Sequence, residues 1–252
     1  MVINGEDKHC ALLSLSQNQQ KNSFDKLGIE VCGQQHKISQ LILNDWLSHF
    51  TIGDIDFTLN VPGQYNVMNA LAAITTCLGL GVSIENCAQG LQLYEGIERR
   101  FHFIGNEKGI TVIDDYAHNP AKVEACLTAV HSMRTKTGKK KRVVAIFHPH
   151  GFGPMKLLQK EFIETFIHSL EDQDLLFMPE IYYAGGSADK SISSNDIIQE
   201  INKRKPIGTF FADKNALLKK LPRIVKKDDL IINMGARDPN LGSFARKILY
   251  TI

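Results

Sequence analysis

The chain has 252 residues, of which 43% are hydrophobic and 22% charged, an ordinary composition for a soluble globular protein. The net charge of +2 argues against a polyanion such as nucleic acid as a partner. No apolar run reaches the length of a membrane span, and the N-terminus lacks the pattern of a signal peptide. We therefore expect a soluble, cytoplasmic protein with no membrane span.

Five cysteines are present, an odd number without a CxxC pair, which argues against a disulfide framework or a zinc site. Cys77 and Cys126 lie within helical apolar patterns, so both are expected to be buried as small apolar side chains.

The first part of the chain, residues 1–62, reads as short strands and turns. Residues 10–15 and 29–32 are strand-like, and residues 54–60 alternate with period two. Residues 16–26 fit a loop or a short helix.

Two helices are predicted next. Apolar residues spaced three to four apart indicate a helix over 66–80, and Ser83 can cap a second helix that ends near residue 94. The connection at 96–100 leads us to divide the chain into 1–98 and 99–252.

Strands and helices alternate after residue 100. Strands are predicted at 109–113, 142–147, 175–178, 207–211 and 230–234, and helices end near 133 and 170 or span 194–202, 215–221 and 241–249. This order predicts an α/β fold with a mainly parallel, Rossmann-like sheet covered on both faces. The basic run at 136–142 is interpreted as a solvated loop.

Charged, imidazole and glycine residues gather in the turns after four of these strands, at 114–120, 148–154, 179–186 and 235–238. Ligands of parallel sheets bind beyond the carboxyl ends of the strands, so these turns predict one ligand-binding rim. A simpler interpretation is that their Asp and Asn residues cap the following helices, as we prefer for Asp238. Capping alone does not require four turns of this kind.

Three segments resemble, in order and spacing, the second half of the Mur ligases, which join amino acids to UDP-N-acetylmuramate in peptidoglycan synthesis. They are GQYNVMNALAA at 63–73, RRF at 99–101 and DDYAHNP at 114–120. HPH at 148–150, EIYYAG at 180–185 and MGARD at 234–238 are most similar to one branch of this family. That branch includes the UDP-N-acetylmuramate–alanine ligases and the murein peptide ligases.

The resemblance implies that residues 1–98 are the C-terminal part of a central ATPase domain and that 99–252 are the Rossmann-like C-terminal domain. No GxxxxGK[ST] motif is present, so we expect the phosphate-binding loop and the UDP-sugar domain upstream, and no activity without them. The complete enzyme would be an ATP- and Mg²⁺-dependent ligase. Its partners would be a UDP-muramyl substrate, an amino acid or peptide, and the missing N-terminal domains.

The same resemblance implies roles for individual residues. Asn66 and Asn69 would contact adenine, while Arg100, Asp115 and Tyr116 would bind ATP.

Asp115 and His118 would be the catalytic residues, although His118 equally fits a hydrogen-bonded structural histidine. Arg99 is the alternative to Arg100, since either guanidinium suits phosphate oxygens. Asn66 also fits the N-cap of its helix, and Asp114 is interpreted as a residue that caps or orients its turn.

The chain departs from the family at residues that are expected to bind the substrate. The arginines that follow HPH in the alanine-adding branch are absent, and the segment here reads GFGPMK. His150, Lys156, Tyr182 and Arg237 remain as substrate-binding candidates, unless the acceptor is not a free α-amino acid. His148 and His150 lack a third ligand nearby, so no metal site is assigned.

Two other classes of function compete with the ligase. A non-catalytic nucleotide- or metabolite-binding module is the alternative, because the phosphate-binding loop and the substrate arginines are absent. A dinucleotide oxidoreductase is disfavoured, since no GxGxxG joins a strand to a helix.

Overall fold

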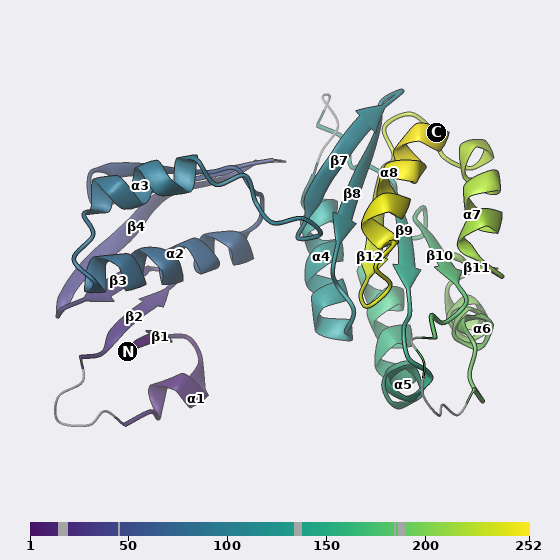
Figure 1. Cartoon of the computed structure of the whole chain (residues 1–252), viewed down its shortest axis with the longest axis horizontal. Coiled ribbons are helices and arrows are strands. Elements are labelled where there is room, and N and C mark those ends of the chain that lie inside the picture. The colour runs from purple at the N-terminus through teal and green to yellow at the C-terminus, as the bar shows by residue number, and fades with distance from the viewer. Residues whose placement is uncertain (15–19, 45, 134–137, 184, 186–189) are drawn as a thin grey trace. The chain divides into compact units, whose positions relative to one another are not determined.

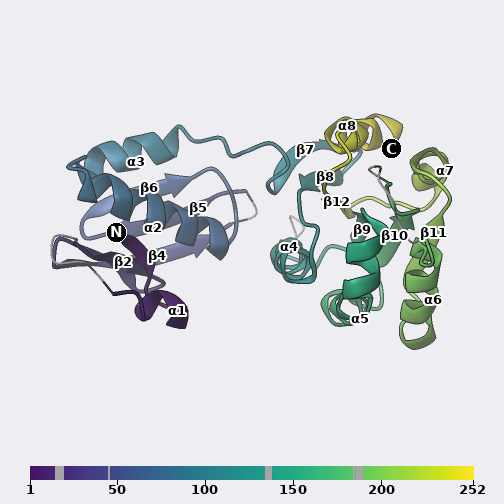
Figure 2. The same ribbon diagram turned by 60° about the horizontal axis from the view of Figure 1, so that its bottom comes forward.

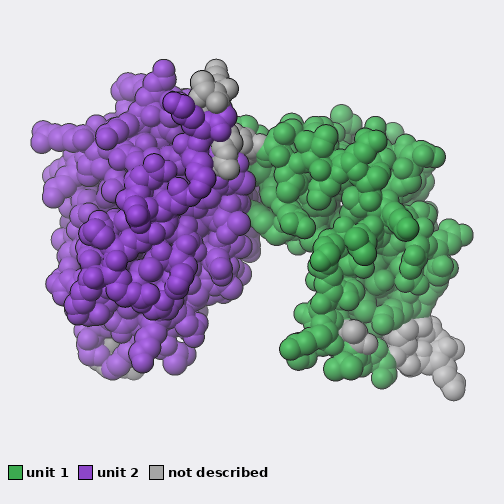
Figure 3. All heavy atoms as spheres, turned by 180° about the vertical axis from the view of Figure 1, so that it is seen from behind, with its two compact units in different colours: residues 1–96 green, residues 97–252 purple. Residues whose placement is uncertain are grey.

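The computed structural model describes residues 1–252 except 15–19, 45, 134–137, 184 and 186–189. The chain forms two compact units, residues 1–96 and 97–252 (Figure 3, green and purple). This division lies two residues before the boundary that the sequence suggested. Within the described part of the chain, no helix combines the length and the apolar character needed to cross a bilayer.

The first unit is a six-stranded sheet with two main helices (Figure 1). Its strands lie in sequence order, and only β1 and β2 are parallel. The strands are β1 (Val2–Asn4), β2 (Asn22–Asp25), β3 (Gly28–Val31), β4 (Gln34–Leu43), β5 (Ser48–Ile52) and β6 (Ile55–Leu59). The helices are α1 (Lys8–Ala11), α2 (Gln64–Gly79) and α3 (Ile84–Gln92).

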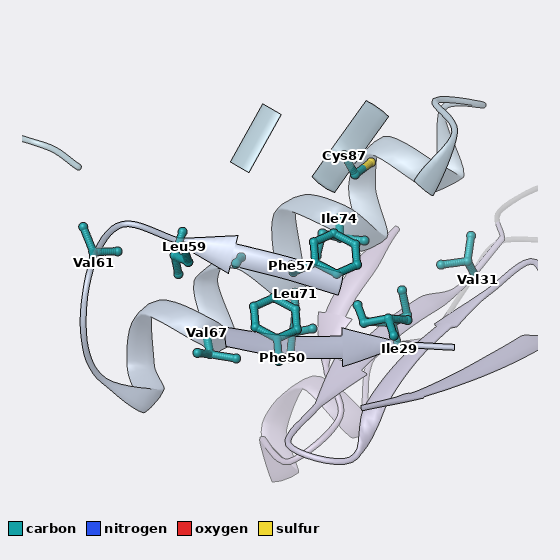
Figure 4. Packing of buried hydrophobic residues seen from close by; sticks show 12 residues of the cluster. Ile29, Val31, Phe50, Phe57, Leu59, Val61, Val67, Leu71, Ile74 and Cys87 are labelled. Atoms are coloured by element: carbon teal, nitrogen blue, oxygen red, sulfur yellow. The ribbon is translucent and has the colours of Figure 1, made fainter. Parts of the chain in front are cut away.

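The apolar core of the first unit lies between its sheet and α2 and α3 (Figure 4). The rings of Phe50 and Phe57 are stacked, with centroids 5.1 Å apart. Leu71 and Ile74, one helical turn apart on α2, are fully buried beside them. This spacing is the apolar pattern from which the helix was predicted, and Ser83 caps α3 as expected by accepting from the N–H of Asn86.

Three predictions in the first unit are wrong. The segment at 16–26, expected to be a loop or a short helix, contains strand β2 in its described part. The segment at 10–15 is not a strand in its described part, because the Asp7 carboxylate accepts from the N–H groups of His9 and Cys10 and starts α1 instead. Asn66 is not an N-cap, since α2 begins earlier, with Gly63 at the cap position. The Asn66 side chain instead donates to the Pro62 carbonyl at 2.7 Å.

The second unit contains a sheet with strand order β11-β10-β9-β12-β8-β7. Every pair is parallel except β7 with β8, which confirms the mainly parallel sheet. The strands are β7 (His102–Glu107), β8 (Ile110–Asp115), β9 (Val143–His148), β10 (Leu175–Pro179), β11 (Gly208–Phe211) and β12 (Leu230–Gly235). The sequence did not reveal β7.

Helices cover both faces of this sheet. Figure 2 shows α4, α5 and α6 on one face and α7 and α8 on the other. These are α4 (Pro120–Ser132), α5 (Phe152–Ser169), α6 (Ser194–Arg204), α7 (Lys214–Lys220) and α8 (Leu241–Thr251). Cys126 of α4 is buried as predicted, whereas Cys77 of the first unit is only partly buried.

Candidate functional site at the carboxyl ends of the strands

The register of the sheet in the second unit brings the predicted turns to one edge. Met234 of β12 pairs with Asp115 of β8, and Gly235 pairs with His148 of β9. The turn residues that follow these pairs therefore lie side by side. We call this edge the rim, meaning Arg99–Phe101 and the residues from Asp114, His148 and Gly235 onward in the three turns.

Asp114 and Asp115 are strand residues rather than turn residues. The pairing of β8 with β12 continues through both of them, so the predicted turn begins one residue after Asp115. Asp114 is fully buried, and neither oxygen of its carboxylate caps a helix. The helix-capping role in this turn belongs to Asn119, whose side chain accepts from the N–H of Lys122 at 2.9 Å.

Asp115 holds the backbone on two sides of the rim. Its Oδ2 accepts from the N–H of Phe101 and its Oδ1 from the N–H of Ala117, both at 2.7 Å. Burial raises the pKa of this carboxyl, while the two N–H groups and the charges of Arg100 and Arg99 oppose the rise. Asp115 therefore fixes both the RRF segment and the turn that follows β8.

Asp114 belongs to a buried polar network that crosses the sheet. Its Oδ2 accepts from Arg99 Nε at 3.2 Å, and its Oδ1 accepts from Asn233 Nδ2 at 2.7 Å. The Oδ1 of Asn233 lies 2.7 Å from His148 Nε2, which must carry the proton because that amide oxygen only accepts. Burial lowers the pKa of His148 to about 4, so the ring is neutral at pH 7.

Two arginines surround the ring of Tyr116. Arg99 Cζ lies 4.9 Å and Arg100 Cζ 5.7 Å from its centroid, within the range of cation–π attraction. Arg99 is also tied to the fold, because its Nη2 donates to the Gly235 carbonyl at 2.7 Å. Arg100 is exposed, and within the described residues no carboxylate pairs with it.

His118 and His150, in the turns that follow β8 and β9, lie close together, with ring centroids 5.8 Å apart. Nδ1 of His118 lies 2.9 Å from the Tyr116 carbonyl, to which it must donate, so Nε2 bears the lone pair of the neutral ring. His150 is fixed by a parallel bridge to Tyr182. Burial, followed by the nearby His118 and Arg237, lowers the pKa of His150.

Arg237 follows β12 in the left-handed conformation, with φ of 63°, and its side chain is exposed. Nothing that the structure describes forms an ion pair with it. The neighbouring Asp238 does not cap α8 as predicted, because the N-cap is Asn240. Asp238 instead forms an ion pair with Lys214. Burial raises the pKa of Asp238, but the hydrogen bonds from Lys214 and from the Asn240 N–H together lower it below its ordinary value.

Three predicted site residues belong to elements other than those that form the rim. Lys156 is in the first turns of α5, and its Nζ donates to Ser191 Oγ at 3.0 Å. Asn66 and Asn69 belong to α2 of the first unit, and their contact with adenine stays a prediction. Asn233 and Lys214 were missed by sequence reasoning, although an asparagine inside the apolar run of β12 was a usable signal.

The donors of the rim suit anions better than metal ions. Its unpaired groups are guanidinium and imidazole, whereas Mg²⁺ takes oxygen ligands. Among the residues that the structure describes, no three His, Cys, Asp or Glu side chains cluster in a way that could hold a metal.

Comparison with known proteins gives a consistent family. Residues 99–237 match the glutamate ligase domain of Mur ligases. Over 180 residues the chain is 37% identical to the UDP-N-acetylmuramate–L-alanine ligase of Acetivibrio thermocellus, covering 71% of this chain and 36% of that protein. The corresponding ligase of Bdellovibrio bacteriovorus is 33% identical over 183 residues, covering 73% of this chain and 38% of that protein. The chain thus spans little more than a third of the length of these relatives.

Solved structures agree on the fold. The UDP-N-acetylmuramate–alanine ligase of Thermotoga maritima has a TM-score of 0.64 at 21% identity, covering 90% of this chain and 47% of that chain. The UDP-N-acetylmuramoylalanyl-D-glutamyl-2,6-diaminopimelate–D-alanyl-D-alanyl ligase of Acinetobacter baumannii has a TM-score of 0.72 at 17% identity, covering 99% of this chain and 50% of that chain. The family match and the curated relatives together show that the chain belongs to the Mur ligase family.

Proposed function

We propose that this chain supplies the C-terminal part of an ATP-dependent ligase that joins an amino acid or peptide to a UDP-muramyl acceptor. In this reaction a carboxylate oxygen attacks the γ-phosphorus of ATP, which forms an acyl phosphate and releases ADP. An amine then attacks the carbonyl, phosphate leaves, and the nitrogen loses a proton. Most of the catalysis of the first step comes from positioning and charge neutralisation.

The observation that carries this proposal is the uncompensated positive charge on the rim. Arg100 and Arg237 are both exposed, and neither has a carboxylate partner within the described residues. A guanidinium presents a planar fork that matches phosphate or carboxylate oxygens. ATP and the UDP-muramyl acceptor are anions, and the incoming amino acid or peptide carries a carboxylate, so the exposed guanidinium groups suit these substrates.

We assign the nucleotide to the side of the rim that holds Arg100. This guanidinium would bind phosphate oxygens, and Tyr116 would contact the nucleotide beside it. Each oxygen of Asp115 accepts one backbone N–H and keeps a second lone pair, to which a ribose hydroxyl could donate. Bound Mg²⁺ would neutralise phosphate charge.

We assign the incoming amine to the side that holds Arg237 and His150, next to Tyr182. Lys156 is the weaker candidate for its carboxylate because it already donates to Ser191. The Nε2 lone pair of His118 could accept the proton that the attacking amine loses. The bridge between His150 and Tyr182 would keep this side of the rim in place.

The test is an ADP-release assay on the full-length gene product, with UDP-muramyl acceptors and individual amino acids or peptides. Arg100→Ala and Asp115→Ala should each reduce turnover by well over tenfold, which corresponds to more than about 1.4 kcal/mol of transition-state stabilisation. Arg223→Ala is the matched control, since this exposed arginine precedes β12 at the opposite end of the sheet. ATP binding without ADP release for any acceptor would favour the non-catalytic module.

A further inference from the structure

Near the start of the second unit, hydrogen bonds to neighbouring residues hold Arg99 and Phe101 in an unfavourable backbone conformation. Arg99 and Phe101 both have positive φ, 60° and 49°, which is unfavourable for residues other than glycine. Such a conformation persists where the surroundings hold it. Here Arg99 donates to Asp114 and to the Gly235 carbonyl, while the N–H of Phe101 donates to Asp115.

Asp114 is itself held so that its carboxylate has one orientation. Asn233 occupies its second oxygen, and His148 donates to Asn233 in turn. The relative exposures are 0%, 0% and 4% for Asp114, Asn233 and His148, so water does not compete with these bonds. The His148 ring packs edge-on against Phe244 of α8, with centroids 5.1 Å apart. The network therefore runs from the core of the sheet to the Arg99 guanidinium.

We propose that Asp114 is a positioning residue that holds Arg99 and thereby sets Arg100 and Tyr116 for the ligand. Arg99 lies beside the Tyr116 ring. The Arg100 N–H donates to the Ile97 carbonyl and closes a tight turn, which fixes the backbone of Arg100. Arg100 is then left with its charge exposed and uncommitted. This inference rests on the proposed function for its ligand, but the placement of Arg99 and Tyr116 does not.

The second unit contains a matched pair at the opposite end of the same strands. Asp229 is 3% exposed and precedes β12, and it accepts from Arg142 Nε at 2.9 Å. Asp229→Asn thus removes a buried carboxylate of the same kind without touching the rim. Asp114→Asn keeps an amide oxygen that accepts from Asn233, but it replaces the oxygen facing Arg99 Nε with an NH₂ group that cannot accept, so the charge and the bond to Arg99 are both lost.

Two measurements test the proposal on the full-length gene product, as in the ADP-release assay. Without ligand, NMR follows solvent exchange of the Arg99 Nε–H and the ring signals of Tyr116. With ATP as the probe, titration gives Kd for the wild type, Asp114→Asn, Asp229→Asn, Arg100→Ala and the double variant Asp114→Asn/Arg100→Ala. We expect Asp114→Asn to speed exchange at least about tenfold and to weaken ATP binding about tenfold, a size typical of one lost charge-assisted contact.

The double variant separates positioning from general destabilisation. If Asp114 acts through Arg100, Asp114→Asn should weaken ATP binding less than about twofold in the Arg100→Ala background. Asp229→Asn should change neither signal nor Kd. Unchanged Arg99 and Tyr116 signals in Asp114→Asn, or the same tenfold loss with and without Arg100, would overturn the proposal. Failure of the wild type to bind ATP would refute the proposed nucleotide role, and the ligand-free signals would still decide the positioning role.

Discussion

His148 should make the second unit less stable as the pH falls. An unfolded histidine titrates near 6.5, whereas burial lowers the pKa of His148 to about 4 in the folded chain. Above pH 6.5 both states are neutral there and the residue has no effect. Between pH 6.5 and pH 4 the unfolded chain binds a proton at His148 that the folded chain does not bind. The free energy of unfolding therefore decreases as the pH falls through this range. At about 1.4 kcal/mol per pKa unit, the loss is about 2 kcal/mol at pH 5 and about 3 kcal/mol below pH 4.

Replacing His148 with Gln should remove this loss. Gln cannot be protonated in this range, and its amide keeps an N–H donor for Asn233. The assay is urea unfolding at about pH 7.5 and about pH 5, followed by the methyl NMR signals of Ile231 and Ile232. These residues lie in the core of β12 and report on the second unit alone.

The pH-dependent difference between the two chains isolates this residue, because the other titrating groups are common to both. His168→Gln is the matched control, as this α5 histidine has a side chain 72% exposed. We expect that control to differ from the wild type by less than about 0.5 kcal/mol across the range. Equal pH dependence for the wild type and His148→Gln would refute the assigned protonation state.

Two further predictions concern packing in each unit. Gly28→Ala should destabilise the first unit by at least about 2 kcal/mol, because an added Cβ would lie 2.1 Å from the His36 carbonyl oxygen across the β3–β4 pair. Trp46 fluorescence during thermal unfolding measures this, and Gly90→Ala, with open space around it, should be neutral or stabilising. Cys126 should resist iodoacetamide in the folded chain, since burial, followed by Asp115 and Asp114, raises the pKa of its thiol. Exposed Cys32 should react first, and equally fast labelling of both by mass spectrometry would contradict the packing.

The central strands of the second unit that the sequence revealed are buried on both faces. Residues 143–147 of β9 are an unbroken apolar run, and the run in β12 is interrupted by Asn233, because helices cover both sides of the sheet. β4 was missed for the opposite reason, since most of its ten residues are exposed and its pattern is interrupted by a bulge between Ser39 and Ile42. Its pairing with β3 and β5 defines it, and such pairing is not visible in one segment alone.

The rim was predictable because the register of parallel strands sends successive turns to one edge. The buried hydrogen bonds that support the rim were not predictable, because they depend on which polar groups meet across β8, β12 and β9. Asn233 looked like one polar residue in an apolar strand, yet it links Asp114 to His148. A buried amide must find partners, so a lone Asn within such a run signals a second polar residue on a neighbouring strand.

Arg99 and Arg237 show how an arginine that stabilises the fold differs from one that is available to a ligand. Both have left-handed backbones, which cost a residue other than glycine about 1 kcal/mol. Arg99 offsets that cost with bonds to Asp114 and the Gly235 carbonyl. Arg237 has no ion pair within the described chain, so the fold gives it no such compensation. In the proposed reaction the missing partner is an anion, which is why Arg237 is expected to govern the choice of substrate rather than stability.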